Sequence, residues 1–187
     1  MADIRFLTDI SRIDQISESE RKALAPVVEA FRFQVSDYYL SLINWDDPHD
    51  PIRKLIIPNI GELSSTGELD ASDEKSNYVA PGLQHKYPHT ALLVCTESCA
   101  SFCRYCFRKR LFMQGNGEVN SQVDDGISYI AKTPDISNVL LTGGDPLTLP
   151  TDRLESIISA IRKIDHVGII RIGTKTPAFN PYRILDD

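Results

Sequence analysis

Three cysteines in the middle of the chain, Cys99, Cys103 and Cys106, have the spacing of a metal-binding loop. Three thiolates on one tight loop can hold a [4Fe–4S] cluster, which in proteins usually takes four Cys ligands. Three ligands leave one iron with an open coordination position. By the logic that separates catalytic from structural zinc sites, an open position is typical of a metal that meets its substrate. The spacing therefore predicts a reactive iron–sulfur cluster.

A fourth cysteine, Cys95, ends the apolar run 91–94, and we interpret it as strand packing, because a buried Cys behaves as a small hydrophobic residue. Two other classes of protein stay open. In a non-catalytic electron carrier, all four cysteines would be cluster ligands. In a structural zinc module, the ligands would commonly form two separated pairs. A disulfide framework is not expected, since four clustered cysteines in 187 residues are too few and too local.

The composition is that of a soluble globular protein, with 42% hydrophobic residues, 25% charged residues and a net charge of −6. The acidic balance argues against a general role in binding nucleic acid or an anionic membrane. No apolar run approaches the length of a membrane span, and the N-terminus lacks the plan of a signal peptide. We expect a cytoplasmic protein, because a reducing compartment suits an oxygen-sensitive cluster.

The first third of the sequence predicts helices and connectors, including a helix that starts at Ser17 and a short apolar helix over 37–43. The polar and acidic stretch 61–77 is typical of a surface loop. From Thr90 onward, strands alternate with helices, which implies a parallel sheet with right-handed crossovers. The predicted strands cover 90–95, 137–141 and 167–172, and the predicted helices cover 122–132 and 152–164.

A Gly-Gly-Asp turn, Gly143 to Asp145, follows the second predicted strand and precedes a helix. Two glycines let the backbone approach a ligand closely, and the acid could accept hydrogen bonds from an ammonium group. The alternative is a tight strand–helix turn with Pro146 near the helix start. Ligand chemistry in parallel sheets gathers at the C-terminal strand ends. The turn and the cysteine loop are therefore predicted to share one edge of the sheet.

The cysteine spacing, the aromatic Tyr105 before the last cysteine and the turn Gly143, Gly144 and Asp145 together resemble the radical S-adenosylmethionine (SAM) superfamily. The resemblance implies a partial (β/α) barrel. It also implies that SAM sits on the open iron, with Tyr105 and the Gly-Gly-Asp turn as its contacts. An external electron donor reduces the cluster, SAM is cleaved, and a 5′-deoxyadenosyl radical removes a hydrogen from the substrate.

Further motifs in order resemble the lysine 2,3-aminomutase family: residues 80–88, 103–110, 143–147, 171–177 and 181–184. This resemblance implies pyridoxal phosphate (PLP) as a second cofactor and migration of an amino group on lysine or a similar small amino acid. It places Lys86 and Tyr87 near the PLP phosphate and Arg108 on the substrate carboxylate. A bidentate guanidinium suits that task.

Two alternatives to this reading of the resemblance stay open. The basic run 108–110 could be a solvated surface patch. The enzyme could also modify a lysine side chain of a protein, in the manner of the branch that acts on a translation elongation factor.

We divide the chain into an N-terminal helical region with a connector, 1–80, and the N-terminal part of the barrel, 81–187. The predicted α/β fold is a barrel truncated after about three βα units, with a helical extension before it. No segment matches the lysine that would hold PLP. We therefore expect the N-terminal part of a longer enzyme, inactive by itself. Self-association into a homo-oligomer stays open.

Overall fold

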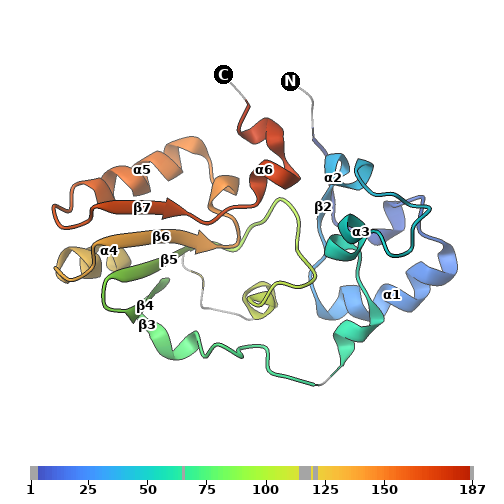
Figure 1. Ribbon diagram of the computed structural model, residues 1–187, viewed down its shortest axis with the longest axis horizontal. Helices are drawn as coiled ribbons and strands as arrows, with labels where there is room; N and C mark the ends of the chain where they lie inside the picture. Colours follow the sequence, from blue (N-terminus) through green and yellow to red (C-terminus); the bar gives the residue numbers. More distant parts are fainter. Residues whose placement is uncertain (1–3, 65, 114–118, 120–121, 186–187) are drawn as a thin grey trace. The chain divides into compact units, whose positions relative to one another are not determined.

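The computed structural model describes residues 4–64, 66–113, 119 and 122–185, and their chain separates into two compact units (Figure 1). The first, which we call the helical unit, combines Met1–Leu69, Ala100–Gln114 and Thr176–Asp187. The second, the sheet unit, combines Asp70–Cys99 and Gly115–Lys175. Each unit is therefore made of separate segments of the sequence. The division of the chain at residue 80 stays a prediction.

The sheet unit contains one five-stranded sheet with the order β3-β4-β5-β6-β7. Its strands are β3 (Tyr78–Ala80), β4 (Leu83–Tyr87), β5 (Thr90–Thr96), β6 (Asn138–Gly143) and β7 (Ile169–Ile172). The last three are parallel, as the alternation of strands and helices predicts. The first two are antiparallel additions that the sequence did not predict. The α/β class and the partial, unclosed sheet are thus confirmed for the described residues.

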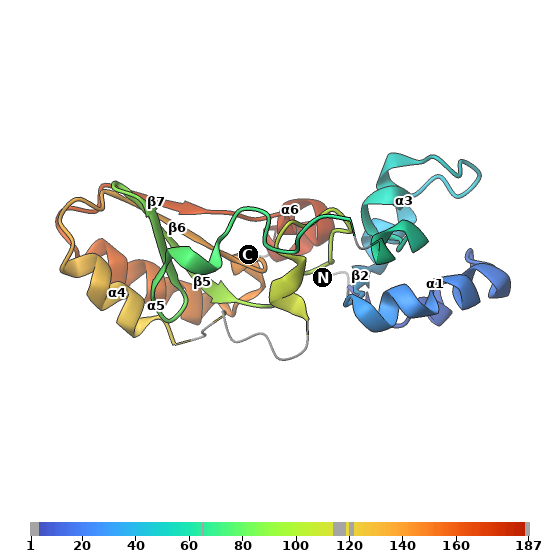
Figure 2. The same cartoon turned by 90° about the horizontal axis from the view of Figure 1, so that it is seen from below.

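Helices α4 (Asp124–Ala131) and α5 (Thr151–Arg162) lie together on one side of this sheet (Figure 2). Side chains alternate between the two faces of a strand, so every second residue of β5 and β6 enters the core beneath the helices. Both helices begin and end within two residues of their predicted bounds. The buried core side chains of this unit include Ala91, Leu93, Cys95, Val139, Leu141, Ile130, Ile157 and Ile161.

The helical unit contains α1 (Glu18–Ala30), α2 (Asp37–Ser41), α3 (Pro51–Ile56) and α6 (Thr176–Phe179), together with an antiparallel pair, β1 (Phe6–Leu7) and β2 (Val35–Ser36). The predicted start at Ser17 is confirmed, because its hydroxyl accepts the Glu20 N–H at 3.2 Å. The core of this unit includes Ile13, Ile16, Val35, Ile56, Ala100 and Phe179. One residue of the cysteine loop, Ala100, is therefore part of this core.

In the part of the chain that the structure describes, six short 3₁₀ turns connect these elements. They are η1 (Ile10–Arg12), η2 (Ile60–Leu63), η3 (Lys75–Asn77), η4 (Lys109–Phe112), η5 (Pro146–Thr148) and η6 (Pro181–Arg183). Among the described residues, no helix is both long and apolar enough to span a membrane.

Shortening Leu141 to Ala should destabilise the sheet unit by about 2–5 kcal/mol, because the removed atoms leave a cavity beneath the helices. The matched control is Ile169→Ala on β7, where the side chain is 55% exposed and the change should stay within about 0.5 kcal/mol. Urea unfolding followed by circular dichroism measures both free energies. Equal losses in the two variants would contradict the placement of the core.

Candidate cofactor site at the ends of β5 and β6

The Gly-Gly-Asp turn after β6 packs directly against the chain that leaves β5. The Gly144 N–H donates to the Thr96 carbonyl at 2.6 Å, and the Asp145 N–H donates to the Ser98 carbonyl at 2.7 Å. The Thr148 hydroxyl donates to the same Ser98 carbonyl at 3.2 Å. The two predicted ligand loops therefore meet at one sheet edge, and the contact falls one residue before the first cysteine of the motif.

This contact depends on both glycines. Gly143 has a φ of 122°, a backbone conformation that side-chain-bearing residues rarely adopt. A Cβ atom on Gly144 would overlap the Ser98 carbonyl oxygen and lie 2.8 Å from the Ser98 carbonyl carbon. The close neighbour that requires glycine here is the backbone of Ser98. This agrees with the alternative prediction that the two glycines form a tight strand–helix turn. Contact of these glycines with a ligand stays a prediction.

The carboxylate of Asp145 is buried and joins the ends of β6 and β7. Its Oδ1 accepts the Leu147 N–H at 3.0 Å and the Thr174 hydroxyl at 2.6 Å. Its Oδ2 accepts the Lys175 N–H at 2.7 Å. An ionised carboxylate offers about four acceptor positions. Asp145 therefore orders the sheet edge itself, and its contact with an ammonium group stays a prediction.

The four cysteines fall into two groups. Cys95 is 1% exposed in β5, its thiol donates to the Thr142 carbonyl at 3.5 Å, and burial raises its pKa to about 11. The interpretation of Cys95 as strand packing is confirmed. The electron-carrier alternative is disfavoured, because its fourth ligand would have to leave the core of the sheet unit.

The other three cysteines are partly exposed and form no disulfide. Cys99 belongs to the sheet unit, whereas Cys103 and Cys106 belong to the helical unit. Burial raises the pKa of the Cys106 thiol. Among the described residues, no three His, Cys, Asp or Glu side chains are gathered closely enough to hold a metal ion. The role of Cys99, Cys103 and Cys106 as cluster ligands stays a prediction.

Backbone hydrogen bonds anchor the second half of the cysteine loop to the helical unit. The Phe102 N–H donates to the Gln34 carbonyl at 3.0 Å, and the Arg104 N–H donates to the Leu55 carbonyl at 2.8 Å. Within the loop, the Cys106 N–H reaches the Cys103 carbonyl at 3.1 Å. The path of the chain between these two cysteines is therefore defined by ordinary protein contacts.

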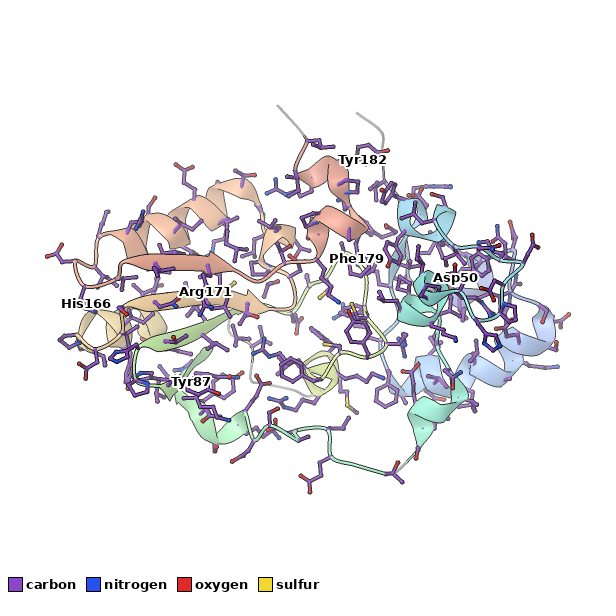
Figure 3. The ribbon with its side chains drawn as sticks, viewed as in Figure 1. Asp50, Tyr87, His166, Arg171, Phe179 and Tyr182 are labelled. Carbon is purple, nitrogen blue, oxygen red and sulfur yellow. The ribbon has the colours of Figure 1, made fainter. Side chains whose placement is uncertain are left out.

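The residues singled out by family resemblance differ in exposure. Lys86 and Tyr87 end β4 with exposed side chains, and Tyr87 is labelled in Figure 3. The Lys86 ammonium donates to the Ser72 carbonyl at 3.5 Å. Tyr105 is also exposed. Arg108 is 8% exposed and lies over the Phe107 ring, 5.0 Å from its centroid. A solvated basic patch therefore does not describe Arg108, whose contact with substrate stays a prediction.

One part of the site was missed at the sequence level. The stretch 61–77, predicted as a surface loop, contains Glu62, whose largely buried carboxylate binds Arg104 and Lys109 of the cysteine loop. The only sequence signal was the pairing of Asn59 with Glu62, the spacing of a capping box. That signal predicts a local turn and carries no information on distant partners.

Comparison with known proteins identifies the class of this chain. The radical SAM superfamily matches residues 93–187, which contain both the cysteine motif and the Gly-Gly-Asp turn. The chain therefore belongs to the radical SAM superfamily. Membership in this superfamily implies a [4Fe–4S] cluster and SAM as cofactors.

Individual relatives show which members of the superfamily this chain is similar to. The chain is 52% identical over 98% of its length to a protein of Aquifex aeolicus named "Putative L-lysine 2,3-aminomutase". It is 38% identical over 98% of its length to the L-lysine 2,3-aminomutase of Clostridium subterminale. It is 37% identical over 97% of its length to the glutamate 2,3-aminomutase of Clostridioides difficile. The chain spans 49%, 45% and 44% of these three relatives, which is about half of each.

The packing of Gly144 against Ser98 predicts how a larger residue would act. Gly144→Val must displace the Ser98 backbone and with it Cys99, so the affinity for the cluster should fall about tenfold or more, the usual cost of removing support from a metal ligand. Iron content after anaerobic reconstitution measures this. The control is Gly168→Val, because a Cβ there meets nothing closer than the Ser137 carbonyl at 3.9 Å. Full iron content in Gly144→Val, with only SAM affinity lost, would show that the glycine serves the ligand instead.

Proposed function

We propose that this chain is the cluster- and SAM-binding part of a radical SAM aminomutase, which moves an amino group between neighbouring carbons of an amino acid. The observation that carries the proposal is the junction of the two motif loops. The cysteine loop leaves β5 and the Gly-Gly-Asp turn leaves β6 at one sheet edge, joined through Thr96 and Ser98. The names of the relatives support the reaction class.

Exposure separates the three cysteines of the motif from the fourth cysteine. Cys99, Cys103 and Cys106 are partly exposed, whereas Cys95 lies in the core with its pKa raised to about 11 by burial. In the proposal, the three accessible thiolates hold a [4Fe–4S] cluster and leave one iron free. When bound, the cluster and SAM together supply one-electron bond cleavage, and an external electron donor supplies the electron.

The chain's own residues bind and orient SAM in this proposal. Gly143 and Gly144 present backbone groups at the sheet edge, and the Asp145 carboxylate lies at the same edge, where it accepts from Leu147, Thr174 and Lys175. The exposed ring of Tyr105 offers an apolar contact surface beside the last cysteine. Each of these roles rests on the match between this chain and the superfamily motif.

A second group of residues would hold PLP and the substrate. Lys86 and Tyr87 are exposed at the end of β4, where a phosphate can reach them. PLP supplies a carrier for the migrating amino group. The Arg108 guanidinium would pair with the substrate carboxylate, a planar bidentate interaction that fixes orientation.

We propose a free α-amino acid as the substrate, because a carboxylate partner for Arg108 is absent from a lysine inside a protein chain. The relatives are named for lysine and for glutamate, so both are candidates. A cytoplasmic location and a homo-oligomeric state stay predictions.

The cluster assignment predicts a clear pattern of variants. Replacing Cys99, Cys103 or Cys106 singly by Ala should abolish the iron–sulfur absorbance after anaerobic reconstitution, whereas the wild type should bind about four irons per chain. The matched control is Cys95→Ala, which should keep the cluster because Cys95 is a core residue. Loss of the cluster in Cys95→Ala would overturn the three-ligand assignment.

The reaction itself is tested in the complete enzyme that carries these residues. Reconstituted protein with reductant, SAM and PLP should convert lysine or glutamate to the corresponding β-amino acid at about 1 per second or faster. Arg108→Lys should lower the rate and raise the KM, because an ammonium cannot form the bidentate pair. Steady cleavage of SAM with no β-amino acid from either substrate would contradict the aminomutase proposal while leaving the superfamily assignment intact.

A further inference from the structure

The carboxylate of Glu62 lies between two cations that flank Cys106. Arg104 donates from Nε to Oε1 at 3.0 Å and from Nη2 to Oε2 at 2.7 Å. Lys109 donates from Nζ to Oε2 at 2.5 Å. The side chains of Glu62 and Arg104 are 11% and 6% exposed. This is a two-armed, charge-assisted interaction shielded from water, unlike a typical solvent-exposed ion pair.

Glu62 is itself held in place. It lies in η2, and its Oε1 accepts the Asn59 N–H at 2.8 Å, which completes a capping box. Burial raises the pKa of Glu62, but the hydrogen bonds from Arg104 and Lys109 outweigh it, so the pKa lies below its ordinary value. Glu62 therefore stays charged at neutral pH in a fixed position.

Arg104 and Lys109 connect the fixed carboxylate of Glu62 to the cysteine loop. Arg104 lies between Cys103 and Cys106, and its Nη1 also donates to the Arg32 carbonyl at 3.0 Å. Lys109 follows Cys106 by three residues, and its ammonium lies 4.4 Å from the centroid of the Phe31 ring. One carboxylate thus restrains the loop on both sides of Cys106.

We propose that Glu62 is a positioning residue for the iron–sulfur cluster, acting through Arg104 and Lys109 to hold Cys103 and Cys106 and to balance the two positive charges beside them. The inference rests on the proposed function, because it assumes that these cysteines bind the cluster. It adds a residue from a distant segment of the chain, 42 positions before Arg104. No part of the cysteine motif itself contains an acid.

The first test replaces the charge while keeping the shape. In the reconstituted protein, Glu62→Gln should lose its cluster to an iron chelator about tenfold faster than the wild type. Its cluster should also have a more positive reduction potential, because two nearby cations then favour the more negative, reduced form. The matched control is Glu68→Gln, an exposed acid of the same segment, which should behave as the wild type in both measurements.

The second test separates positioning from simple structural support. Lys109→Gln removes the ion pair between Lys109 and Glu62 and one positive charge, so it should also speed cluster loss. It should shift the reduction potential in the opposite direction, to more negative values. A loss of fold alone would not give opposite shifts, and Lys109→Gln decides the matter if Glu62→Gln fails to fold.

Cluster retention and reduction potential equal to the wild type in both variants would overturn the role of Glu62. Potentials that shift in the same direction in both variants would overturn the charge-balancing part of it. A wild-type protein that binds no iron would instead refute the proposed function. The two failures are therefore distinguishable in one set of measurements.

Discussion

The close approach of two backbones at the ends of β5 and β6 is the constraint on which the site depends. The turn after β6 must come near enough for Gly144 and Asp145 to donate to the chain leaving β5, and a side chain at position 144 would prevent it. Parallel pairing of β5 with β6 brings the two segments to one edge. The glycines then allow the last step of the approach. Everything proposed for SAM begins from this junction.

After Ser98, the cysteine loop is held by backbone hydrogen bonds and also by a buried ion pair. In the helical unit, Arg104 donates its backbone N–H to the Leu55 carbonyl and its guanidinium to Glu62. The first anchor is built from neutral backbone groups, and the second from buried charges. A buried charge left without its partner is costly, so the second anchor is the more sensitive to substitution.

The sequence predicts the parts of the fold that have a regular apolar pattern. Strand β5 is a short apolar run whose last four residues are all buried, and helices α4 and α5 bury every third or fourth residue. The predicted bounds of all three elements are close to those observed. Strand β4 was missed because Gln84, His85 and Lys86 break any apolar alternation, although Gln84 is buried. Its place is set by pairing with β5, which a local pattern does not reveal.

In the site too, local sequence patterns could be found from the sequence, whereas contacts with distant segments could not. The three cysteines and the Gly-Gly-Asp turn could be found by spacing alone, whereas the neighbour that Gly144 needs could not. Sequence cannot distinguish a glycine that admits a ligand from one that admits another stretch of backbone. Glu62 was hidden for a related reason, because its partners Arg104 and Lys109 lie 42 and 47 residues away.

Amide hydrogen exchange in the cluster-free protein tests most directly whether protein contacts alone order the cysteine loop. The amides of Gly144, Asp145 and Arg104 each donate to a carbonyl at 2.6–2.8 Å. They should exchange far more slowly than the same amides in urea, because exchange then requires local opening of the structure. Exchange at the unfolded rate at all three positions would contradict the account, since the loop would then be ordered only when the cluster binds.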